Sequence, residues 1–512
     1  MSMSIEQSAS RRLSNLLQGF AEIDASIDCD IQALSLDSRK AMKGDLFFAC
    51  AGTQGHGLDF LDQVFNKGVA AVAWEPTAEY DLPPGKYNAD SPVPLIAIDN
   101  LSDQVGRIAD RFYHSPSSDL RVIGITGTDG KTSCSHFLAN ALCSDQQPVG
   151  VIGTLGYGLI GNLESASHTT PDAIRIHQLL DQMRDQGAQY VVMEVSSHGL
   201  SQGRVSGVEF EVAVLTNVSR DHLDYHGDEK SYAQAKQKLF FMPGLNKVVL
   251  NRDDDFGQQL MKLLPSFVNV VTYGDGSLST AAAGDDLSFT DLDLDREGIS
   301  WRVEGSLGEA NFKHHLFGRF NVYNLVAVMS AMMQLGLGWD QICKRVDTVA
   351  TVPGRMEFYK SSVRSNSPVV IIDFAHTPDA LRQVLQALAH HGFGRICCVF
   401  GCGGDRDKGK RPLMGSIASD LADRVILTDD NPRSEDGDGI IDEILSGISD
   451  SSNVTVVRDR EQAILHALEN ASGNDVVLVA GKGHEQYQLI GNEKITFSDS
   501  HVVTTWLNGG LH

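Results

Sequence analysis

The sequence predicts an α/β protein of three domains, each built around a parallel sheet. The chain has 512 residues, and because one domain usually holds about 100–200, about three cores are expected. Short apolar runs that end in Gly, Asp, Asn or Ser recur along the chain, and each is followed by a helical pattern. This alternation is typical of parallel sheets covered by helices, and it places functional loops at the carboxyl ends of the strands.

Eight apolar runs are predicted to be buried strands and four segments to be helices. The strands are expected at 122–126, 190–195, 212–216, 247–250, 369–373, 396–400, 425–428 and 476–480. The helices are expected at 131–142, 231–240, 324–335 and 378–389. An acidic segment, 274–297, is expected to form an exposed β excursion.

Turn-forming residues set the predicted domain boundaries near residues 98 and 353. A proline-rich stretch lies at 81–94, and Pro353-Gly354 precedes a new βα series. The predicted domains are therefore 1–98, 99–353 and 354–512.

The composition excludes several classes of protein. Hydrophobic residues make up 42% and charged residues 21%, as in ordinary globular chains, so disordered and fibrous classes are excluded. The 42 Lys and Arg face 66 Asp and Glu, a net charge of −24, which argues against a nucleic-acid-binding protein. An anionic substrate therefore needs local positive charge.

Targeting and redox signals are absent from the sequence. The N-terminus lacks the apolar region of a signal peptide, and no stretch approaches the ~18–20 apolar residues of a membrane span. We therefore expect a cytoplasmic protein that does not insert into membranes. The eight cysteines are scattered and form no C-x-x-C pair, so neither a disulfide framework nor a zinc site is expected.

A glycine loop in the run VIGITGTDGKTS, 122–133, is predicted to bind phosphate. Five residues separate Gly124 from Gly130, one more than in the common P-loop, so the pattern that fits is the shorter G-x-x-G-K-T at 127–132. Such a loop aims backbone N–H groups at phosphate, while Lys131 supplies positive charge and Thr132 a hydroxyl for Mg²⁺. The alternative is an ordinary glycine-rich turn, and the strand before the loop favours nucleotide binding.

Two further strands carry polar residues near their carboxyl ends. Glu194 lies near the end of YVVMEVSSHGL, and His222 follows the strand in VAVLTNVSRDHLDYHG. Carboxylate and imidazole beside a phosphate loop can complete a Mg²⁺ site, although Mg²⁺ takes mostly oxygen ligands. Taken alone, His222 is more often a hydrogen-bonded loop histidine, and Lys236 in SYAQAKQKLF an exposed helix lysine.

With this loop and these strand ends, the chain resembles the Mur ligase family, ATP-dependent amide-forming enzymes that assemble the peptidoglycan stem peptide. The family loop is typically G-T-[ND]-G-K-[ST], and the resemblance covers nearly the whole chain in three blocks. It implies a Rossmann-like N-terminal domain that binds the uridine nucleotide, a central P-loop ATPase-like domain, and a Rossmann-like C-terminal domain that binds the amino acid.

The resemblance also assigns the catalytic chemistry. It implies Mg²⁺ as cofactor, with Thr132, Glu194, His222 and the carbamate formed from Lys236 and CO2 as ligands. Carbamylation is reasonable because a partly desolvated lysine loses its proton more easily; Lys238 is the less favoured alternative. The catalytic residues are expected to be Lys131, Glu194, His222, Lys236 and Arg355, the last stabilising the transferring phosphate.

Two ligand sets follow from matching positions. The ATP set is Gly127, Thr128, Asp129, Gly130, Lys131, Thr132, Ser133, Asn321, Asn324, Asp373 and His376. The set for the UDP-MurNAc-peptide is Leu36, Ser38, Thr53, Gln54, Gly55, Thr169, Thr170, Ser196, Gln202 and Arg204. Without the resemblance, Thr170 or Asp172 is simply a helix-capping residue and the N-terminal segment only a strand and two turns.

A third set decides the amino acid. The chain has DDNPR, the D-N-P-R form that the family associates with meso-diaminopimelate, whose second carboxylate a guanidinium can hold bidentately. The set is Arg406, Asp430, Asn431, Pro432, Arg433, Gly481 and Glu485. Glu485 is expected to pair with the ammonium group; in isolation Arg433 is an exposed loop arginine.

The resemblance thus implies a monomeric enzyme with three small-molecule substrates, ATP, meso-diaminopimelate and UDP-N-acetylmuramoyl-L-alanyl-D-glutamate. An acyl phosphate forms, the amine displaces phosphate, and ADP and phosphate are released. The alternatives are a lysine-adding ligase or a folylpolyglutamate synthetase of the same architecture, and a catalytically silent nucleotide-binding module.

Overall fold

The computed structural model describes residues 11–52, 55–80, 93–278 and 286–510. The chain divides into two compact units, one of residues 1–272 with 334–336 and the other of residues 273–333 with 337–512. Parallel sheets occur in the N-terminal, central and C-terminal regions, which confirms the predicted fold class. The boundaries at residues 98 and 353 stay predictions.

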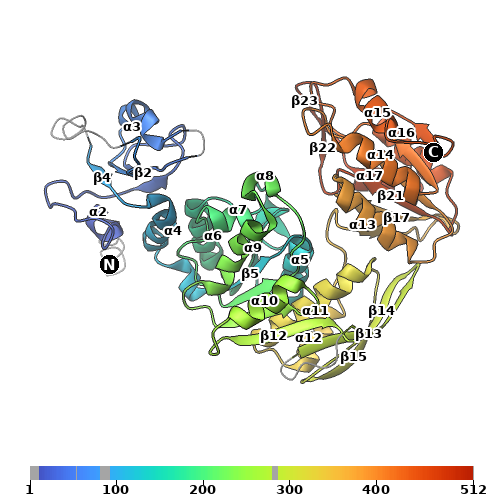
Figure 1. Cartoon of the computed structure of the whole chain (residues 1–512), viewed down its shortest axis with the longest axis horizontal. Coiled ribbons are helices and arrows are strands. Elements are labelled where there is room, and N and C mark those ends of the chain that lie inside the picture. Colours follow the sequence, from blue (N-terminus) through green and yellow to red (C-terminus); the bar gives the residue numbers. More distant parts are fainter. Residues whose placement is uncertain (1–10, 53–54, 81–92, 279–285, 511–512) are drawn as a thin grey trace. The chain divides into compact units, whose positions relative to one another are not determined.

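The N-terminal sheet of the first unit, which lies in the blue part of the chain in Figure 1, has four parallel strands in sequential order. Its strands are β1 (Ala33–Ser35), β2 (Asp45–Ala49), β3 (Ala71–Trp74) and β4 (Leu95–Ala97). Helix α2 (Leu13–Leu16) precedes these strands, η1 (Gly57–Phe60) and α3 (Leu61–Lys67) lie between β2 and β3, and α4 (Leu101–Phe112) and η2 (Pro116–Asp119) follow β4. Every residue of β2 and β3 is buried, as expected for apolar strands covered on both faces.

The central sheet of the first unit runs in the order β11-β10-β5-β9-β6-β7-β8, and its first five strands are parallel. Its strands are β5 (Arg121–Thr126), β6 (Val149–Gly153), β7 (Gly156–Leu159), β8 (Asn162–Glu164), β9 (Tyr190–Glu194), β10 (Val212–Leu215) and β11 (Lys247–Asn251). The associated helices are α5 (Lys131–Leu142), α6 (Ala173–Asp185), α7 (Ser197–Ser201), α8 (Leu223–His226), α9 (Glu229–Gln237), η3 (Lys238–Phe241) and α10 (Asp255–Leu263).

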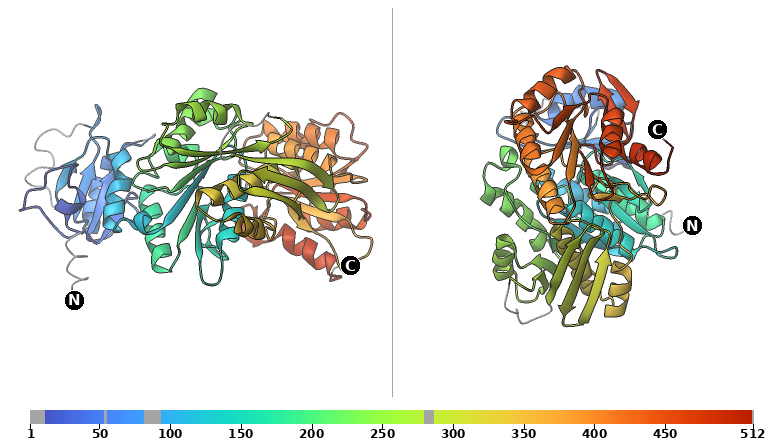
Figure 2. Two further views of the ribbon diagram at one scale, coloured as in Figure 1. Left: turned by 90° about the horizontal axis from the view of Figure 1, so that it is seen from below. Right: turned by 90° about the vertical axis from the view of Figure 1, so that its right-hand side faces the viewer.

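The second unit begins with antiparallel strands, visible side by side in Figure 2. They are β13 (Asp286–Asp295), β14 (Gly298–Gly305) and β15 (Gly308–His314). The strand before them, β12 (Asn269–Asp275), contains the boundary between the two units, at residues 272 and 273. The expected β structure is thereby confirmed for its described residues, but the expected exposure is only partial, because Leu287 and Phe289 are buried. Helices α11 (Arg319–Gln334) and α12 (Trp339–Val346) follow.

The C-terminal sheet has the order β16-β17-β21-β18-β19-β20, with β16 alone antiparallel to its neighbour among these described strands. The strands are β16 (Glu357–Tyr359), β17 (Val369–Asp373), β18 (Ile396–Phe400), β19 (Arg424–Leu427), β20 (Val454–Val456) and β21 (Val476–Ala480), with a separate hairpin of β22 (Tyr487–Ile490) and β23 (Glu493–Thr496). The helices are α13 (Pro378–Ala389), α14 (Lys410–Leu421), α15 (Gly437–Leu445), α16 (Arg460–Glu469) and α17 (Asp499–Leu507).

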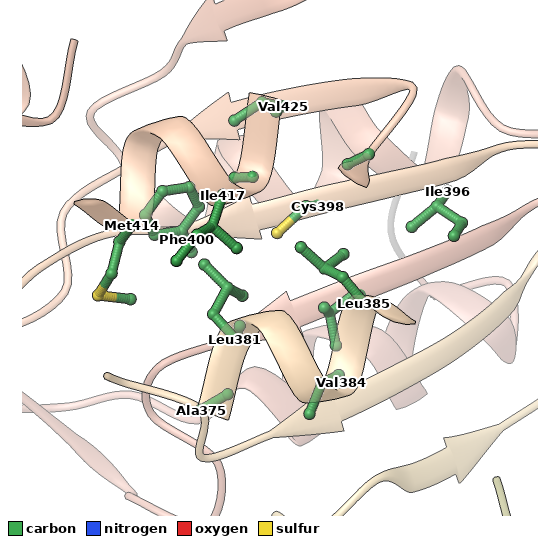
Figure 3. Close-up of a cluster of buried hydrophobic side chains, with 14 of the residues drawn as sticks. Ala375, Leu381, Val384, Leu385, Ile396, Cys398, Phe400, Met414, Ile417 and Val425 are labelled. Carbon is green, nitrogen blue, oxygen red and sulfur yellow. The ribbon is translucent and has the colours of Figure 1, made fainter. Parts of the chain in front are cut away.

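The core of the C-terminal sheet explains the position of its helices. Figure 3 shows Leu381 and Leu385 of α13 pointing toward Cys398 and Phe400 of β18. The helix begins where Thr377 caps it and Pro378 occupies its first turn, so its apolar face meets the sheet directly after β17. The loops that follow the strands are consequently held by a close-packed base.

The sequence predicted neither a disulfide framework nor insertion into a membrane. All eight cysteines are free thiols. In the described part of the chain, helices of the length and apolar character required to span a bilayer are absent.

Candidate active site

The phosphate loop joins β5 to α5, and two glycines permit its path. Gly127 has φ 153° and Gly130 φ 81°, and a Cβ on Gly127 would lie 1.8 Å from Thr216 Oγ1. The loop is bonded to the end of β10, since Thr128 N donates to Asn217 O at 2.8 Å and Asp129 N to Asn217 Oδ1 at 3.0 Å. The N-terminus of α5 therefore opens onto a fixed loop, the arrangement that binds phosphate.

Two lysines converge on one carbonyl of this loop. Lys131 Nζ donates to Gly127 O at 2.9 Å and to Thr128 O at 2.7 Å, and Lys236 Nζ donates to Gly127 O at 2.6 Å. Lys236 is 1% exposed, and its Nζ lies 4.3 Å from the centre of the Tyr232 ring. Burial and the nearby Lys131 cation lower the pKa of Lys236 well below its ordinary value. A neutral amine is the form that reacts with CO2.

Glu194 is fully buried and fixed by three hydrogen bonds. Its Oε2 accepts from Thr132 Oγ1 at 2.8 Å and from Thr154 Oγ1 at 3.1 Å, and its Oε1 accepts from Thr154 N at 2.9 Å. A Cβ on Gly153 would lie 2.2 Å from Oε1, so a side chain there would displace the carboxylate. The phosphate loop and the end of β9 thus present a hydroxyl and a carboxylate together, both oxygen ligands of the kind Mg²⁺ prefers.

His222 lies apart from these contacts. It has φ 51°, its side chain is 49% exposed, and its ring centre is 4.9 Å from that of His198 in an edge-to-face arrangement. Burial, together with His222 and His226, lowers the pKa of His198. Within the described ranges, no three His, Cys, Asp or Glu side chains form a group able to hold a metal ion. The oxygen donors fit Mg²⁺, and the complete ligand set stays a prediction.

The predicted peptide-binding residues of the central region share one network. Thr170 Oγ1 donates to Glu194 O at 2.9 Å and accepts from Ser196 N at 2.9 Å, while Arg204 Nη1 donates to Thr170 O at 2.6 Å. Arg204 Nη2 also donates to Gln202 Oε1 at 2.6 Å.

Thr169 joins the same network through Thr154. Its Oγ1 lies 3.0 Å from Thr154 Oγ1, which in turn is bonded to Glu194. Thr154 therefore connects the predicted peptide site to the predicted metal site. The sequence reasoning missed it, although its position just beyond an apolar run is the signal used for other strand ends.

The structure describes some of the residues that are predicted to bind the uridine nucleotide. Ser38 is buried, and its Oγ donates to Gln63 Oε1 at 3.0 Å. Leu36 is exposed, and Gly55 lies beside Asp59. Thr53 and Gln54 lie outside the described residues.

In the second unit, the residues predicted for ATP split into two groups. Asn321 and Asn324 are buried on the first turns of α11, where Asn321 Nδ2 donates to Phe317 O at 2.8 Å. This helix begins at Arg319, earlier than the predicted residue 324. Gly318, with φ 83°, supplies the turn before it.

The second group surrounds β17. Asp373 Oδ2 accepts from Met356 N and Oδ1 from Ala375 N, both at 2.8 Å, and burial raises its pKa while Arg355 opposes that effect. His376 Nδ1 bonds to Phe374 O at 2.8 Å. Asp373 therefore serves to hold the loops around it. Arg355 Nε is buried and, in the described residues, has no hydrogen-bond partner, as expected of a guanidinium that awaits an anion.

The residues predicted for the amino acid are brought together at the carboxyl edge of the C-terminal sheet. Arg433 Nη1 donates to Gly404 O at 2.7 Å, in the loop that precedes Arg406. Asn431 Nδ2 donates to Glu485 Oε2 at 3.0 Å. A Cβ on Gly481 would lie 2.8 Å from Asp430 Oδ2.

Two loops that carry this set are clamped by a further cation. A Cβ on Gly404 would lie 1.9 Å from Pro432 O, so the two loops touch. Arg411, buried, donates to Glu435 Oε1 and Oε2, both at 3.0 Å, and to Gly403 O at 3.2 Å. Neither Arg411 nor Lys482 was predicted from the sequence. Lys482 is buried and lies between Gly481 and Glu485 in the sequence. The closeness of both residues to predicted site residues was the signal that could have identified them.

Sequence comparison connects these regions to known families. The Mur ligase family catalytic domain matches residues 30–113, the Mur ligase middle domain 125–332, and the Mur ligase glutamate ligase domain 354–483. A protein of Alkalilimnicola ehrlichii, named UDP-N-acetylmuramoyl-L-alanyl-D-glutamate–2,6-diaminopimelate ligase, is 46% identical over 495 residues, 96% of this chain and 98% of its own. This chain belongs to the Mur ligase family.

Other Mur ligases agree. The Coxiella burnetii protein of the same name is 45% identical over 474 residues, 92% of this chain and 94% of its own. A solved structure of a ligase with that name has a TM-score of 0.71 and 34% identity, covering 98% of this chain and 99% of that one.

More distant structures share the Mur ligase fold alone. Mycobacterium tuberculosis folylpolyglutamate synthase, solved with ADP and AMPPCP, has a TM-score of 0.59 at 19% identity, covering 74% of this chain and 92% of that one. The predicted family resemblance is confirmed by the closer relatives.

Proposed function

We propose that this chain is an ATP-dependent ligase that joins meso-2,6-diaminopimelate to UDP-N-acetylmuramoyl-L-alanyl-D-glutamate and releases ADP and phosphate. The observation that carries the proposal is the assembly of Arg433, Asn431 and Glu485 into one site. It offers a guanidinium for a second carboxylate and a carboxylate for a second ammonium. Relatives that share 44–46% of their residues bear the name of this ligase.

The reaction has two steps. The D-glutamate side-chain carboxylate attacks the γ-phosphorus of ATP, the bond to the bridging oxygen breaks, and ADP leaves. The amine of diaminopimelate then attacks the carbonyl carbon of the acyl phosphate, loses a proton, and phosphate leaves as the amide forms. Because most of the barrier lies in bringing anions together, the protein contributes positioning and positive charge.

Named residues supply that charge. Lys131 leaves its two loop carbonyls, which bind it at 2.9 and 2.7 Å, to bind phosphate oxygens instead. Arg355, with its Nε unpartnered within the described residues, takes a second phosphate contact. When bound, Mg²⁺ neutralises phosphate charge and orients the phosphate oxygens.

Lys236 takes part as a carbamate. Its buried amine would add to CO2 with release of a proton, and the resulting anion would offer an oxygen ligand that, together with Thr132 and Glu194, could hold Mg²⁺. The lowered pKa of Lys236 supports this role because a larger share of a buried amine is neutral than of an exposed lysine at the same pH. We further propose that the enzyme works in the cytoplasm as a monomer.

The test is release of phosphate from ATP in the presence of the nucleotide-dipeptide and one amino acid at a time. Turnover is expected with meso-diaminopimelate and at least about 10²-fold less with lysine, which lacks the second carboxylate. Equal turnover with lysine would support the lysine-adding alternative. Nucleotide binding without any acceptor-dependent phosphate release would support a silent module, and turnover with a folate acceptor the folylpolyglutamate alternative.

A further inference from the structure

A buried lysine lies directly behind the predicted ammonium-binding carboxylate. Lys482 follows β21, and its side chain is 0% exposed. Its Nζ donates to Glu485 Oε2 at 2.9 Å and to Asn431 Oδ1 at 3.1 Å. Because it is enclosed, Lys482 reaches a ligand only through the groups that it holds.

The Asn431 amide is bonded at both ends in this arrangement. Its Oδ1 accepts from Lys482 Nζ and from Leu489 N at 2.9 Å, and its Nδ2 donates to Glu485 Oε2 at 3.0 Å. A neutral amide with both ends bonded is a fixed support. Asn431 therefore orients Glu485.

Glu485 is held by one of its two oxygens. In the described structure, the hydrogen bonds to its carboxylate, from Lys482 and Asn431, both fall on Oε2, and the side chain is 21% exposed. The other oxygen, Oε1, is thereby available to an incoming donor. Two fixed donors on one oxygen also restrict rotation of the carboxylate.

Lys482 also maintains the charge of Glu485. Burial raises the pKa of Glu485, but Lys482 and the Asn431 hydrogen bond, with His484, lower it below its ordinary value. The surrounding charges include the buried Asp430 and the ion pair of Arg460 with Asp499. Without the Lys482 cation, the cost of burial favours a neutral carboxyl group, which attracts an ammonium weakly.

We propose that Lys482 is a positioning residue that makes this ligase select amino acids with a second ammonium group, by holding Glu485 with one oxygen toward that group. The inference rests on the proposed function, since it assigns Glu485 to the amino acid. It adds a determinant on the amine side of the substrate, complementary to Arg433 on the carboxylate side.

The test compares meso-diaminopimelate with 2-aminopimelate, which keeps both carboxylates and lacks the second amine. In the full-length enzyme, Lys482→Met is expected to lower the preference in kcat/KM for diaminopimelate by about tenfold or more, as expected for loss of one charge-assisted hydrogen bond. The KM for ATP is expected to stay unchanged. Lys494→Met is the matched control, because Lys494 is exposed and its Nζ lies 4.0 Å from the ring centre of the same Tyr487 that faces Lys482.

A double variant separates positioning from general damage. Glu485→Gln alone is expected to remove most of the preference, and adding Lys482→Met is expected to change it no further. Equal losses for both amino acids in Lys482→Met, or an unchanged preference, would overturn the inference. Lys482→Gln gives the same comparison if the methionine variant does not fold. If the wild type fails to use diaminopimelate at all, the proposed function fails instead.

Discussion

Replacement of Arg433 by alanine tests the assignment of the amino acid most directly. The change removes the guanidinium while the backbone contacts can persist, since Arg433 N donates to Leu489 O at 3.0 Å and Arg433 O accepts from Gly491 N at 2.7 Å. The φ of 51° disfavours alanine and arginine alike, so no new strain is introduced. Any loss should therefore concern the ligand and the guanidinium's bond to Gly404 O.

The magnitude follows from the donors that remain for a ligand. Arg433 Nη1 is bonded to Gly404 O at 2.7 Å, which leaves the Nε and Nη2 edge for a carboxylate. Two charge-assisted bonds of about 1.5–3 kcal/mol each, partly replaced by water in the variant, give a net loss of about 3 kcal/mol. This corresponds to about a 10²-fold rise in the KM for diaminopimelate.

The assay is steady-state phosphate release, with diaminopimelate and ATP varied separately. Arg433→Ala should raise the KM for diaminopimelate by that factor and the KM for ATP by less than about threefold, because the ligand contact, not the nucleotide site, is removed. Arg433→Lys keeps a charge without the bidentate geometry and should fall between the two. Equal increases in both KM values, or an unchanged KM for diaminopimelate, would refute the reasoning.

Three further changes test the remaining network. Thr154→Val removes the hydroxyl that joins Thr169 to Glu194, and both the KM for the nucleotide-dipeptide and the Mg²⁺ concentration for half-maximal rate should rise about fivefold to tenfold. Lys236→Met should abolish turnover, which in the wild-type enzyme should depend on added bicarbonate. Because the pKa of Lys236 is lowered in the native state, the unfolded chain binds an extra proton between that lowered pKa and a pH of about 10.4, so wild-type stability rises with pH in this window and the variant lacks this component. Arg460→Met leaves Asp499, which it binds at 2.7 and 2.8 Å in a fully buried pair, without a counter-charge and should cost about 3–5 kcal/mol of unfolding free energy.

Each of these changes has a control or a contradicting outcome. Thr154→Ser keeps the hydroxyl and should behave as the wild type in both titrations; a valine variant with normal constants would contradict the connecting role. Retained turnover in Lys236→Met would contradict the carbamate. For the buried pair, chemical denaturation measures the loss, and the double change of Arg460→Met with Asp499→Leu should recover part of it.

The sequence pattern predicted the bounds of strands and helices correctly where tertiary contacts do not change those bounds. The bounds of β17, β18 and β21 agree with those expected, because each is a continuous apolar run with turn residues at its ends. Helix α9 is the contrast: it ends at Gln237, and the chain continues as a 3₁₀ turn where a longer helix was expected. Packing of Leu239 and Phe240 into the central core accounts for this end.

The site shows the same division. Residues in one continuous motif, such as Gly127 to Ser133, could be predicted because a loop and the helix after it form from adjacent positions. The contacts of Thr154 with Glu194 and of Lys482 with Asn431 could not, since these partners lie 40 and 51 positions away. Only folding brings those partners together.

The bonds between Arg433 and the β22–β23 hairpin bear on how substrate preference can change. The tetrapeptide that ends in Arg433 is held by backbone hydrogen bonds to Leu489 and Gly491. Two segments more than fifty positions apart in the sequence therefore depend on each other structurally. If the tetrapeptide alone were exchanged for that of a relative with another substrate, the residue at position 433 would be bonded to a hairpin that did not come from the same relative. A successful switch of substrate in this protein, by natural drift or by engineering, should carry the hairpin with the loop.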